Sequence, residues 1–441
     1  MLQVKDLRTE YRENPIGIDV IAPRISWKLT SDQRNVRQAS YQIQVANNDI
    51  FRNILWDSGE VKTEDSNFIA LKEVTLESRI RYYFRMKVSD NHSNYSDWSE
   101  VSYFEMGLLD KEDWVADWIA APRQWNGEPA PQLVRTFHVD GEIKKARVYA
   151  TALGLYELHL NGNRVGDDYF TPGWTSYQTR LQYQTYDVTD LLTNGENELL
   201  GLLGNGWYKG GNLGWEGKKD IFGNRLSLLA QLHIEMENGK EVVVTTDENW
   251  QASDSAIRMS EIYHGETYDA RFKVEAKESV EIINHTKDIL VAQENEPVRK
   301  IDMLEPVELM QTPKGETVID FGQNMVGWVS FDIEGKAGQE VEIKHAEILD
   351  GDGNFYTANL RAAKQTNKYI LSGNGKETFE PHFTFQGFRY IQLIGFNEDQ
   401  MELKNFRGVV LHSDMELTGD FKCSDPLINQ LQHNILWGIK R

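Results

Sequence analysis

The chain has 441 residues, more than one hydrophobic core supports, so roughly three domains are expected. Its formal net charge is −21, a field that repels nucleic acid and anionic membranes and suits a neutral ligand. The N-terminal segment lacks the apolar core of a signal peptide, no run reaches the ~18 apolar residues of a membrane span, and Cys423 is the only cysteine. These features predict a soluble cytoplasmic protein without disulfides that binds neither nucleic acid nor membranes.

Residues 1–109 alternate between apolar and polar side chains in the manner of strands, most clearly at 25–29, 41–45 and 82–88. Trp27 comes early in this stretch and tyrosines come late, within about seven short strands over about a hundred residues. This pattern predicts a fibronectin type III-like β-sandwich.

Residues 110–300 show the same alternation at 146–151 and 156–160, followed by Asn161-Gly162, a strong hairpin signal. Further strands are expected at 226–236 and 242–246. A larger jelly-roll sandwich is the natural interpretation.

Residues 301–415 are expected to form a third β-sandwich, because strand patterns again alternate with glycine-containing turns. The expected strands are at 317–321, 326–333, 340–346, 367–371 and 389–394.

The pattern changes in residues 416–441, where Ser424 or Asp425 can cap a helix that tolerates Pro426 in its first turn. Apolar residues then recur at helical spacing: Leu427, Ile428, Leu431, Ile435, Trp437 and Ile439. We expect this segment to be the first helix of a truncated helical domain. The predicted fold class is therefore mainly β, with consecutive sandwiches that end at this helix.

The stretch 203–215 combines glycines with tryptophan and tyrosine, as a sugar site requires. Glycines let the backbone approach a ligand, and flat aromatic faces stack on the C–H groups of a sugar ring. The alternative is that Trp207 and Tyr208 fill the core of the sandwich and that the glycines only shape a loop. The candidate sugar-binding residues are Asn205, Trp207, Tyr208, Trp215, Asp220 and Trp174, with the Asp167-Asp168 pair nearby.

The segment 350–354 places oxygen-bearing side chains at positions one, three and five, as calcium loops do. Phe355 stands where such a loop needs glycine and Arg361 where it needs glutamate, so a solvated hairpin loop is the better interpretation.

Glu266 and Asp269 are the two carboxylates that one could imagine as an acid and base pair. On a strand, residues three apart point to opposite faces, so we expect a structural contact such as Asp269 with Arg271 instead. The sequence also lacks a zinc motif, a nucleophile elbow and a phosphate-binding loop. No residue is therefore predicted to be catalytic.

Several ordered motifs resemble the bacterial α-L-rhamnosidases of glycoside hydrolase family 78. In the second stretch these are the segments 158–167, 172–177, 182–189, 206–208 and 265–271. In the third stretch they are the segments 319–324, 345–347, 359–361 and 383–390, and the segment 421–425 resembles the entry to the family's helical barrel.

The resemblance implies a fibronectin-like domain, a jelly roll related to rhamnose-binding modules, a linker β-domain and then a catalytic (α/α) barrel. It implies inverting hydrolysis of terminal α-L-rhamnose by two carboxylates that lie beyond Arg441. It implies no required cofactor. The related modules can bind the sugar through calcium, but Asn205 stands where such a module carries an acidic residue beside tryptophan, which argues against a calcium site here.

We therefore expect the non-catalytic front part of an α-L-rhamnosidase, which acts on rhamnose-containing glycosides with its missing C-terminal domain and is compatible with a homo-oligomer. The alternatives are a stand-alone carbohydrate-binding or structural protein and β-domains that hydrolyse a substrate themselves. An exposed apolar stripe on the last helix would argue against the stand-alone protein.

Overall fold

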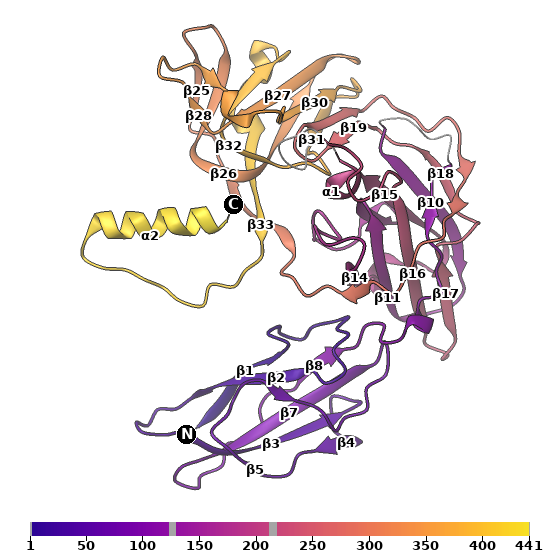
Figure 1. The fold of residues 1–441 in the computed structure, drawn as a ribbon, viewed down its shortest axis with the longest axis vertical. Coiled ribbons are helices and arrows are strands. Elements are labelled where there is room, and N and C mark those ends of the chain that lie inside the picture. The colour runs from indigo at the N-terminus through magenta and orange to yellow at the C-terminus, as the bar shows by residue number, and fades with distance from the viewer. Residues whose placement is uncertain (1, 123–128, 211–217, 441) are drawn as a thin grey trace. The chain divides into compact units, whose positions relative to one another are not determined.

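A computed structural model of the chain describes residues 2–122, 129–210 and 218–440, and strands dominate these ranges (Figure 1). The chain divides into two compact units, the first mainly residues 1–115 and the second mainly residues 116–441. The predicted mainly-β fold is confirmed. Neither α1 nor α2 has the length and apolar composition that a bilayer crossing requires.

The first sandwich consists of a three-stranded sheet in the order β1-β2-β6 and a second sheet in the order β4-β3-β7-β8, with β5 on β3. The strands are β1 (Gln3–Thr9), β2 (Arg24–Thr30), β3 (Gln38–Ala46), β4 (Ile54–Asp57), β5 (Val61–Lys62), β6 (Ile69–Ala70), β7 (Arg81–Asp90) and β8 (Ser102–Glu105). The three strands predicted here from alternation correspond to β2, β3 and β7.

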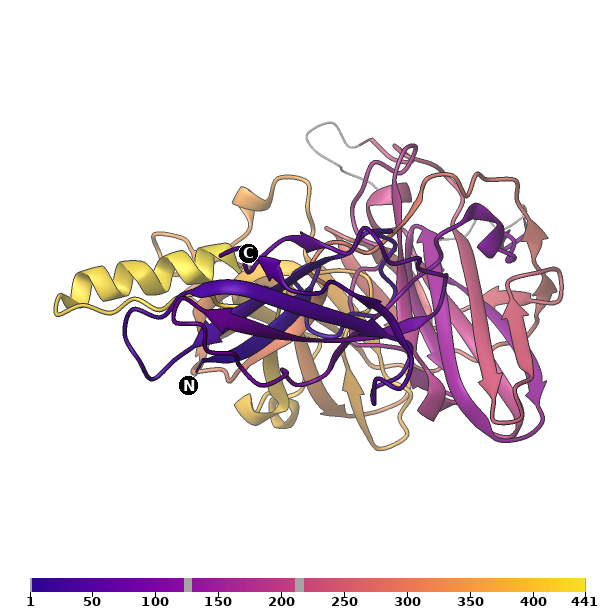
Figure 2. The same ribbon diagram turned by 90° about the horizontal axis from the view of Figure 1, so that it is seen from below.

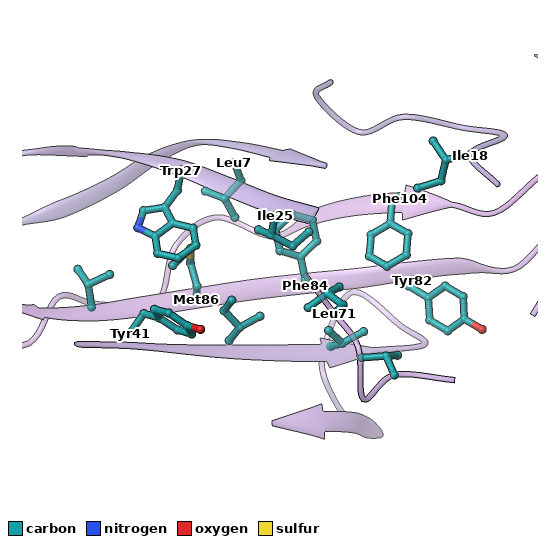
Figure 3. Packing of buried hydrophobic residues seen from close by; sticks show 14 of the residues in the cluster. Leu7, Ile18, Ile25, Trp27, Tyr41, Leu71, Tyr82, Phe84, Met86 and Phe104 are labelled. Atoms are coloured by element: carbon teal, nitrogen blue, oxygen red, sulfur yellow. The ribbon is translucent and has the colours of Figure 1, made fainter. Parts of the chain in front are cut away.

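Inward-facing side chains of both sheets form the core of this sandwich (Figure 3). Ile25 of β2, Phe84 of β7 and Phe104 of β8 are completely buried. Trp27 packs edge-on against Tyr41, and its indole Nε1 donates to Gln38 Oε1 at 2.9 Å, which satisfies the polar atom of this buried ring. The apolar side chains that alternate along these strands thus form one continuous core.

The second sandwich has a six-stranded sheet in the order β13-β12-β15-β10-β18-β21 and a seven-stranded sheet in the order β22-β9-β16-β11-β14-β23, with β17 on β16. Its strands are β9 (Ile119–Ala120), β10 (Pro131–Val139), β11 (Ile143–Leu153), β12 (Leu155–Leu160), β13 (Asn163–Arg164), β14 (Leu181–Asp187), β15 (Gly195–Gly204), β16 (Ser227–Met236), β17 (Glu241–Thr245), β18 (Gln251–Asp254), β21 (Glu278–Ser279), β22 (Glu281–Ile282) and β23 (Leu290–Ala292). The predicted turn at Asn161-Gly162 joins β12 to β13, with both residues at positive φ.

A ten-stranded sheet follows, in the order β19-β20-β30-β27-β32-β26-β33-β24, with β25 and β31 on β26. Its strands are β19 (Ile257–Glu261), β20 (Gly265–Asp269), β24 (Val298–Leu304), β25 (Glu308–Gln311), β26 (Thr317–Glu334), β27 (Glu340–Ala346), β30 (Thr366–Ile370), β31 (Lys376–Phe379), β32 (Gln386–Ile394) and β33 (Phe406–Ser413). A small hairpin pairs β28 (Ile348–Leu349) with β29 (Phe355–Tyr356). Strands β19 and β20 belong to this sheet, although their residues precede 300.

One expectation about the third stretch was wrong in detail. The two strands expected at 317–321 and 326–333 form the single long strand β26. Between the two expected strands the structure has a shift of register, between Asp320 and Met325. A bulge of this kind bends a strand without ending it.

Two helices and five short 3-10 turns complete the described residues. They are α1 (Gly206–Lys209), α2 (Pro426–Ile439) and the turns Lys111–Asp113, Thr189–Leu191, Ala358–Leu360, Glu398–Gln400 and Leu403–Asn405. Asp425 caps α2 by accepting from the backbone amide of Leu427 at 2.9 Å, one of the two caps that the sequence allowed.

Helix α2 keeps most of its apolar side chains in solvent. Leu427 is 79% exposed and Leu431 57%, whereas Trp437 near its end packs against the core of the ten-stranded sheet. Figure 2 shows the helix as a rod that projects beyond the strands of this sheet. The apolar stripe that the sequence predicted is therefore exposed.

The core of the first sandwich yields a stability prediction. Replacing Ile25 with Ala should lower the free energy of unfolding by about 2–5 kcal/mol, because a fully buried side chain leaves a cavity. Urea unfolding followed by fluorescence measures this loss. Ile21, which is 74% exposed, is the matched control, and Ile21→Ala should change stability by less than about 0.5 kcal/mol. Equal losses in both variants would contradict the placement of this core.

Candidate sugar-binding site

The stretch singled out in the sequence lies at the end of strand β15. After Gly204 the chain turns through Asn205 and the one-turn helix α1, in which Gly206 has a φ of +51°. Such a conformation favours glycine, so this residue lets the strand turn sharply. Successive residues of a helical turn point in different directions, and Trp207 and Tyr208 therefore have different surroundings.

Trp207 and Trp174 form an aromatic shelf, the name used below for these two residues. Their rings stack with centroids 6.0 Å apart and an interplanar angle of 11°. Trp174 is 58% exposed and Trp207 is half-buried. The indole Nε1 of Trp207 donates to Tyr263 Oη at 3.1 Å. The shelf thus offers a flat apolar surface to solvent whose inner ring is fixed by a hydrogen bond.

Tyr177 anchors the segment that carries Trp174. This tyrosine is buried, and its hydroxyl donates to the carbonyl oxygen of Gly173 at 2.9 Å. Gly173, which directly precedes the exposed Trp174, is therefore hydrogen-bonded to a buried side chain.

Polar groups lie next to the shelf. Asn205 is half-buried, and its Nδ2 donates to Glu261 Oε1 at 2.8 Å. An amide and a carboxylate beside stacked aromatic rings are the groups that hold sugar hydroxyls.

Tyr208 lies in the core, as the alternative interpretation predicted. It is 8% exposed and packs edge-on against Tyr177 with 5.3 Å between ring centroids, and burial raises the pKa of its hydroxyl. This side chain supports the loop from inside and does not extend the exposed surface.

The other candidates are dispersed. Asp220 is exposed, and its backbone amide donates to the carbonyl oxygen of Lys209. Asp167 and Asp168 contact the guanidinium of Arg299, and Trp215 lies outside the described residues. The structure therefore brings together Asn205, Trp207 and Trp174 of the predicted set.

Glu261 and Tyr263 belong to this site and were not predicted. They lie more than fifty residues after Trp207, on and just after strand β19, and local patterns carry no signal for such a pairing. In the sequence, both residues lie only a few positions before Glu266, one of the two carboxylates considered above as an acid and base pair.

Glu266 is fully buried and forms an ion pair with His382. Its Oε1 lies 2.9 Å from His382 Nδ1, and its Oε2 accepts from the backbone amide of His382 at 3.0 Å. Burial opposes the charge of His382, but the carboxylates of Glu266 and Glu157 outweigh this effect and raise its pKa to about 9. His382 is therefore charged at neutral pH.

A second buried carboxylate, Glu157 of β12, faces the same histidine. Burial opposes its charge, but the hydrogen bond from His159 and the charges of His382 and Arg164 lower its pKa to about 2. His159 Nε2 lies 2.7 Å from Glu157 Oε1, and Arg164 Nε lies 3.2 Å from Oε2. Five ionisable side chains thus form one connected network.

The other two motifs adopt the structural roles favoured above. Arg271 Nε donates to Asp269 Oδ1 at 2.9 Å, and Glu266 and Asp269 have different partners. Asp350 Oδ1 accepts from the backbone amides of Asp352 and Asn354, so the 350–354 segment is a turn within the β28–β29 hairpin.

Calcium takes six to eight oxygen ligands. Of the described residues named above, Glu261 supplies a carboxylate beside the shelf, and one of its oxygens accepts from Asn205. Among the residues that the structure describes, no cluster of three histidine, cysteine, aspartate or glutamate side chains could hold a metal.

Comparison with protein families gives three matches in chain order. They are the Rha78A-like N-terminal immunoglobulin domain at residues 4–110, the α-L-rhamnosidase N-terminal domain at 141–302 and the bacterial α-L-rhamnosidase concanavalin-like domain at 310–412. The chain belongs to the α-L-rhamnosidase family.

Individual relatives agree with this assignment. An α-L-rhamnosidase of Alteromonas sp. (strain LOR) is 35% identical over 97% of this chain, which covers 49% of that protein. The crystal structure of native α-L-rhamnosidase from Aspergillus terreus matches with a TM-score of 0.94 and 34% identity, over 100% of this chain and 52% of that one. The Streptomyces avermitilis α-L-rhamnosidase complexed with L-rhamnose matches with a TM-score of 0.94 and 29% identity, over 99% and 60%.

The chain therefore spans about half the length of the α-L-rhamnosidases that it matches. The aromatic shelf and Tyr263 lie within the second match, at 141–302, whereas the ionic network joins Glu266 of that match to His382 of the third.

The ionic network predicts how stability depends on pH. The pKa of His382 is raised in the folded state from its ordinary 6.5 to about 9, so its stabilisation is complete below pH 6.5 and is lost as the pH rises through 9. The melting temperature should fall by several degrees between pH 7 and pH 10, and His382→Gln should abolish most of this dependence.

Thermal unfolding of the wild type and the variant at four or five pH values measures the difference. His138, which is 61% exposed beside Asp140, is the control, and His138→Gln should leave the slope unchanged. Parallel curves for the wild type and His382→Gln would show that the histidine is not charged in the folded protein.

Proposed function

We propose that this chain is the part of an α-L-rhamnosidase that precedes the catalytic domain, and that it turns over no glycoside by itself. The observation that carries this proposal is the exposed apolar stripe of α2 in a chain that covers only about half of its relatives. A contiguous apolar surface of this kind is normally covered by another element. In this proposal it is covered by further helices of the same protein.

The carboxylates of the described residues support the same conclusion. Inverting hydrolysis needs one protonated and one charged carboxyl group on either side of a glycosidic bond, with space for a water. Glu266 is fully buried against His382, and Asp269 is paired with Arg271. Neither is available to a substrate, so the acid and base are proposed to belong to the missing domain.

A stand-alone binding or structural protein is the alternative, and α2 argues against it. Leu427, Leu431 and Ile439 are each more than half exposed, which is unfavourable for a helix without a further partner. We propose a scaffold role for the β-domains instead, and the contact of Trp437 with the core of the ten-stranded sheet supports it.

We also propose that the aromatic shelf binds rhamnose. The C–H face of a deoxysugar would stack on the exposed ring of Trp174, and its hydroxyl groups would meet Asn205 and Glu261. Uncharged rhamnose also suits a protein with a net charge of −21.

The catalytic part of the proposal is tested with an aryl α-L-rhamnoside. The purified 441-residue chain should release no aryl alcohol above the buffer rate, with the Aspergillus terreus enzyme as the positive control. Turnover that persists through repeated purification would contradict the proposal and would place an acid and base within this chain.

The shelf is tested by calorimetric titration with L-rhamnose. Trp174→Ala should weaken binding by about tenfold, because one stacking contact contributes on the order of 1 kcal/mol. Tyr95→Ala removes an aromatic residue of similar exposure, 57%, from the first sandwich and should leave the affinity unchanged. Equal affinity for the wild type and Trp174→Ala would remove the shelf from the binding site.

A further inference from the structure

The hairpin formed by β19 and β20 joins the second sandwich to the ten-stranded sheet. Its sequence lies within the α-L-rhamnosidase N-terminal match, yet β20 pairs in parallel with β30, about a hundred residues later. Backbone carbonyls of the turn accept further bonds from the later segment. Thr384 Oγ1 donates to Ile262 O at 2.9 Å, and the amide of Thr366 donates to His264 O at 2.9 Å.

Gly265 makes this close approach possible. A Cβ atom at this position would lie 1.9 Å from the carbonyl oxygen of Thr366, and the φ of +115° is unfavourable for any other residue. The next amide, of Glu266, donates to Asn367 Oδ1 at 3.0 Å. The hairpin is therefore seated directly on the backbone of the neighbouring strand.

The same hairpin holds the aromatic shelf. Glu261, at the end of β19, accepts from Asn205, and Tyr263, in the turn, accepts from the indole of Trp207. Phe385, just before β32, packs against both Trp207 and Tyr263 with ring centroids 6.4 Å and 6.3 Å apart. The positions of Glu261 and Tyr263, and with them both hydrogen bonds, thus depend on where the hairpin lies.

The charged anchor of the hairpin is Glu266, only three residues after Tyr263. Its partner His382 stacks on Tyr268 of the same strand, with centroids 5.8 Å apart and an interplanar angle of 7°. From the second sandwich, Glu157 and His159 of β12 and Arg164 of β13 face this pair. The charge of His382 therefore balances two buried carboxylates, one on the hairpin and one on the sandwich.

We infer that Glu266 and His382 are positioning residues for the shelf: their ion pair fixes the β19–β20 hairpin, and through Tyr263 and Glu261 the hairpin sets the orientation of Trp207 and Asn205 toward the sugar. This inference rests on the proposed binding of rhamnose. It makes the sugar site a property of two domains together, because one domain supplies the rings and the other supplies the anchor that orients them.

The test is calorimetric titration of the full chain with L-rhamnose from pH 7 to pH 10. Glu266→Gln should weaken binding about tenfold at pH 7.5, although Glu266 does not face the ligand. The wild type should lose a comparable factor as the pH rises through 9, where His382 gives up its proton, and Glu266→Gln should lack this step. A residue that only contributed stability would leave the affinity and its pH profile unchanged in a variant that remains folded.

Two further variants keep the test decisive. Arg271→Gln breaks the exposed pair with Asp269 beyond the same strand and should leave binding unchanged. Tyr263→Phe removes only the hydroxyl that accepts from Trp207 and should weaken binding by itself, which covers the case in which Glu266→Gln fails to fold. Unchanged affinity in both Tyr263→Phe and a folded Glu266→Gln would overturn the inference.

A second measurement separates this inference from the proposed function. If the wild type binds no rhamnose at any pH, the sugar-binding proposal fails, and hydrogen exchange of the backbone amides of 205–210 decides the positioning role. Faster exchange in Glu266→Gln than in the wild type and Arg271→Gln would support a hairpin that orders the loop. Equal exchange in all three would overturn it.

Discussion

The ion pair between the buried Glu266 and the partly exposed His382 is the interaction on which the arrangement of the second unit depends. Two charges taken out of water are costly, and their attraction compensates for this only when every remaining polar atom is also satisfied. Here the carboxylate of Glu266 also accepts from the backbone amides of His382 and Phe383. Breaking such a pair by removing one partner leaves a buried charge without compensation, which typically costs about 3–5 kcal/mol.

The network also explains why the boundary between the second sandwich and the ten-stranded sheet is not a flexible linker. Glu157 and Arg164 reach it from the sandwich, and the β19–β20 hairpin is built into the sheet. Apolar groups fill the space around it, among them Leu155, Trp328 and Phe383, all nearly or completely buried. Apolar burial supplies most of the stabilisation, and the charged groups define which surfaces meet.

Local order was predictable from the sequence, and long-range partners were not. Strands such as β3, β7 and β27 follow from alternation over a few residues, and the cap of α2 follows from Asp425 next to Pro426. The parallel pairing of β20 with β30 depends on residues about a hundred positions apart, for which period and composition carry no information. The same limit hid Glu261 and Tyr263, whereas the neighbours Trp207 and Tyr208 could not be assigned to surface and core because both are aromatic residues in a single turn.

The order of strands in the ten-stranded sheet has a consequence for synthesis on the ribosome. Strand β20 can pair at once with β19, but its other edge must wait for β30, and β24 is paired only when β33, which ends at Ser413, has been made. Until then the nascent chain presents unpaired strand edges, and long-range pairings of this kind form slowly. In the first sandwich, by contrast, the strands β1 to β8 pair only with one another, and β8 ends at Glu105. Strand edges of the ten-stranded sheet are therefore exposed for longer during synthesis than those of the first sandwich.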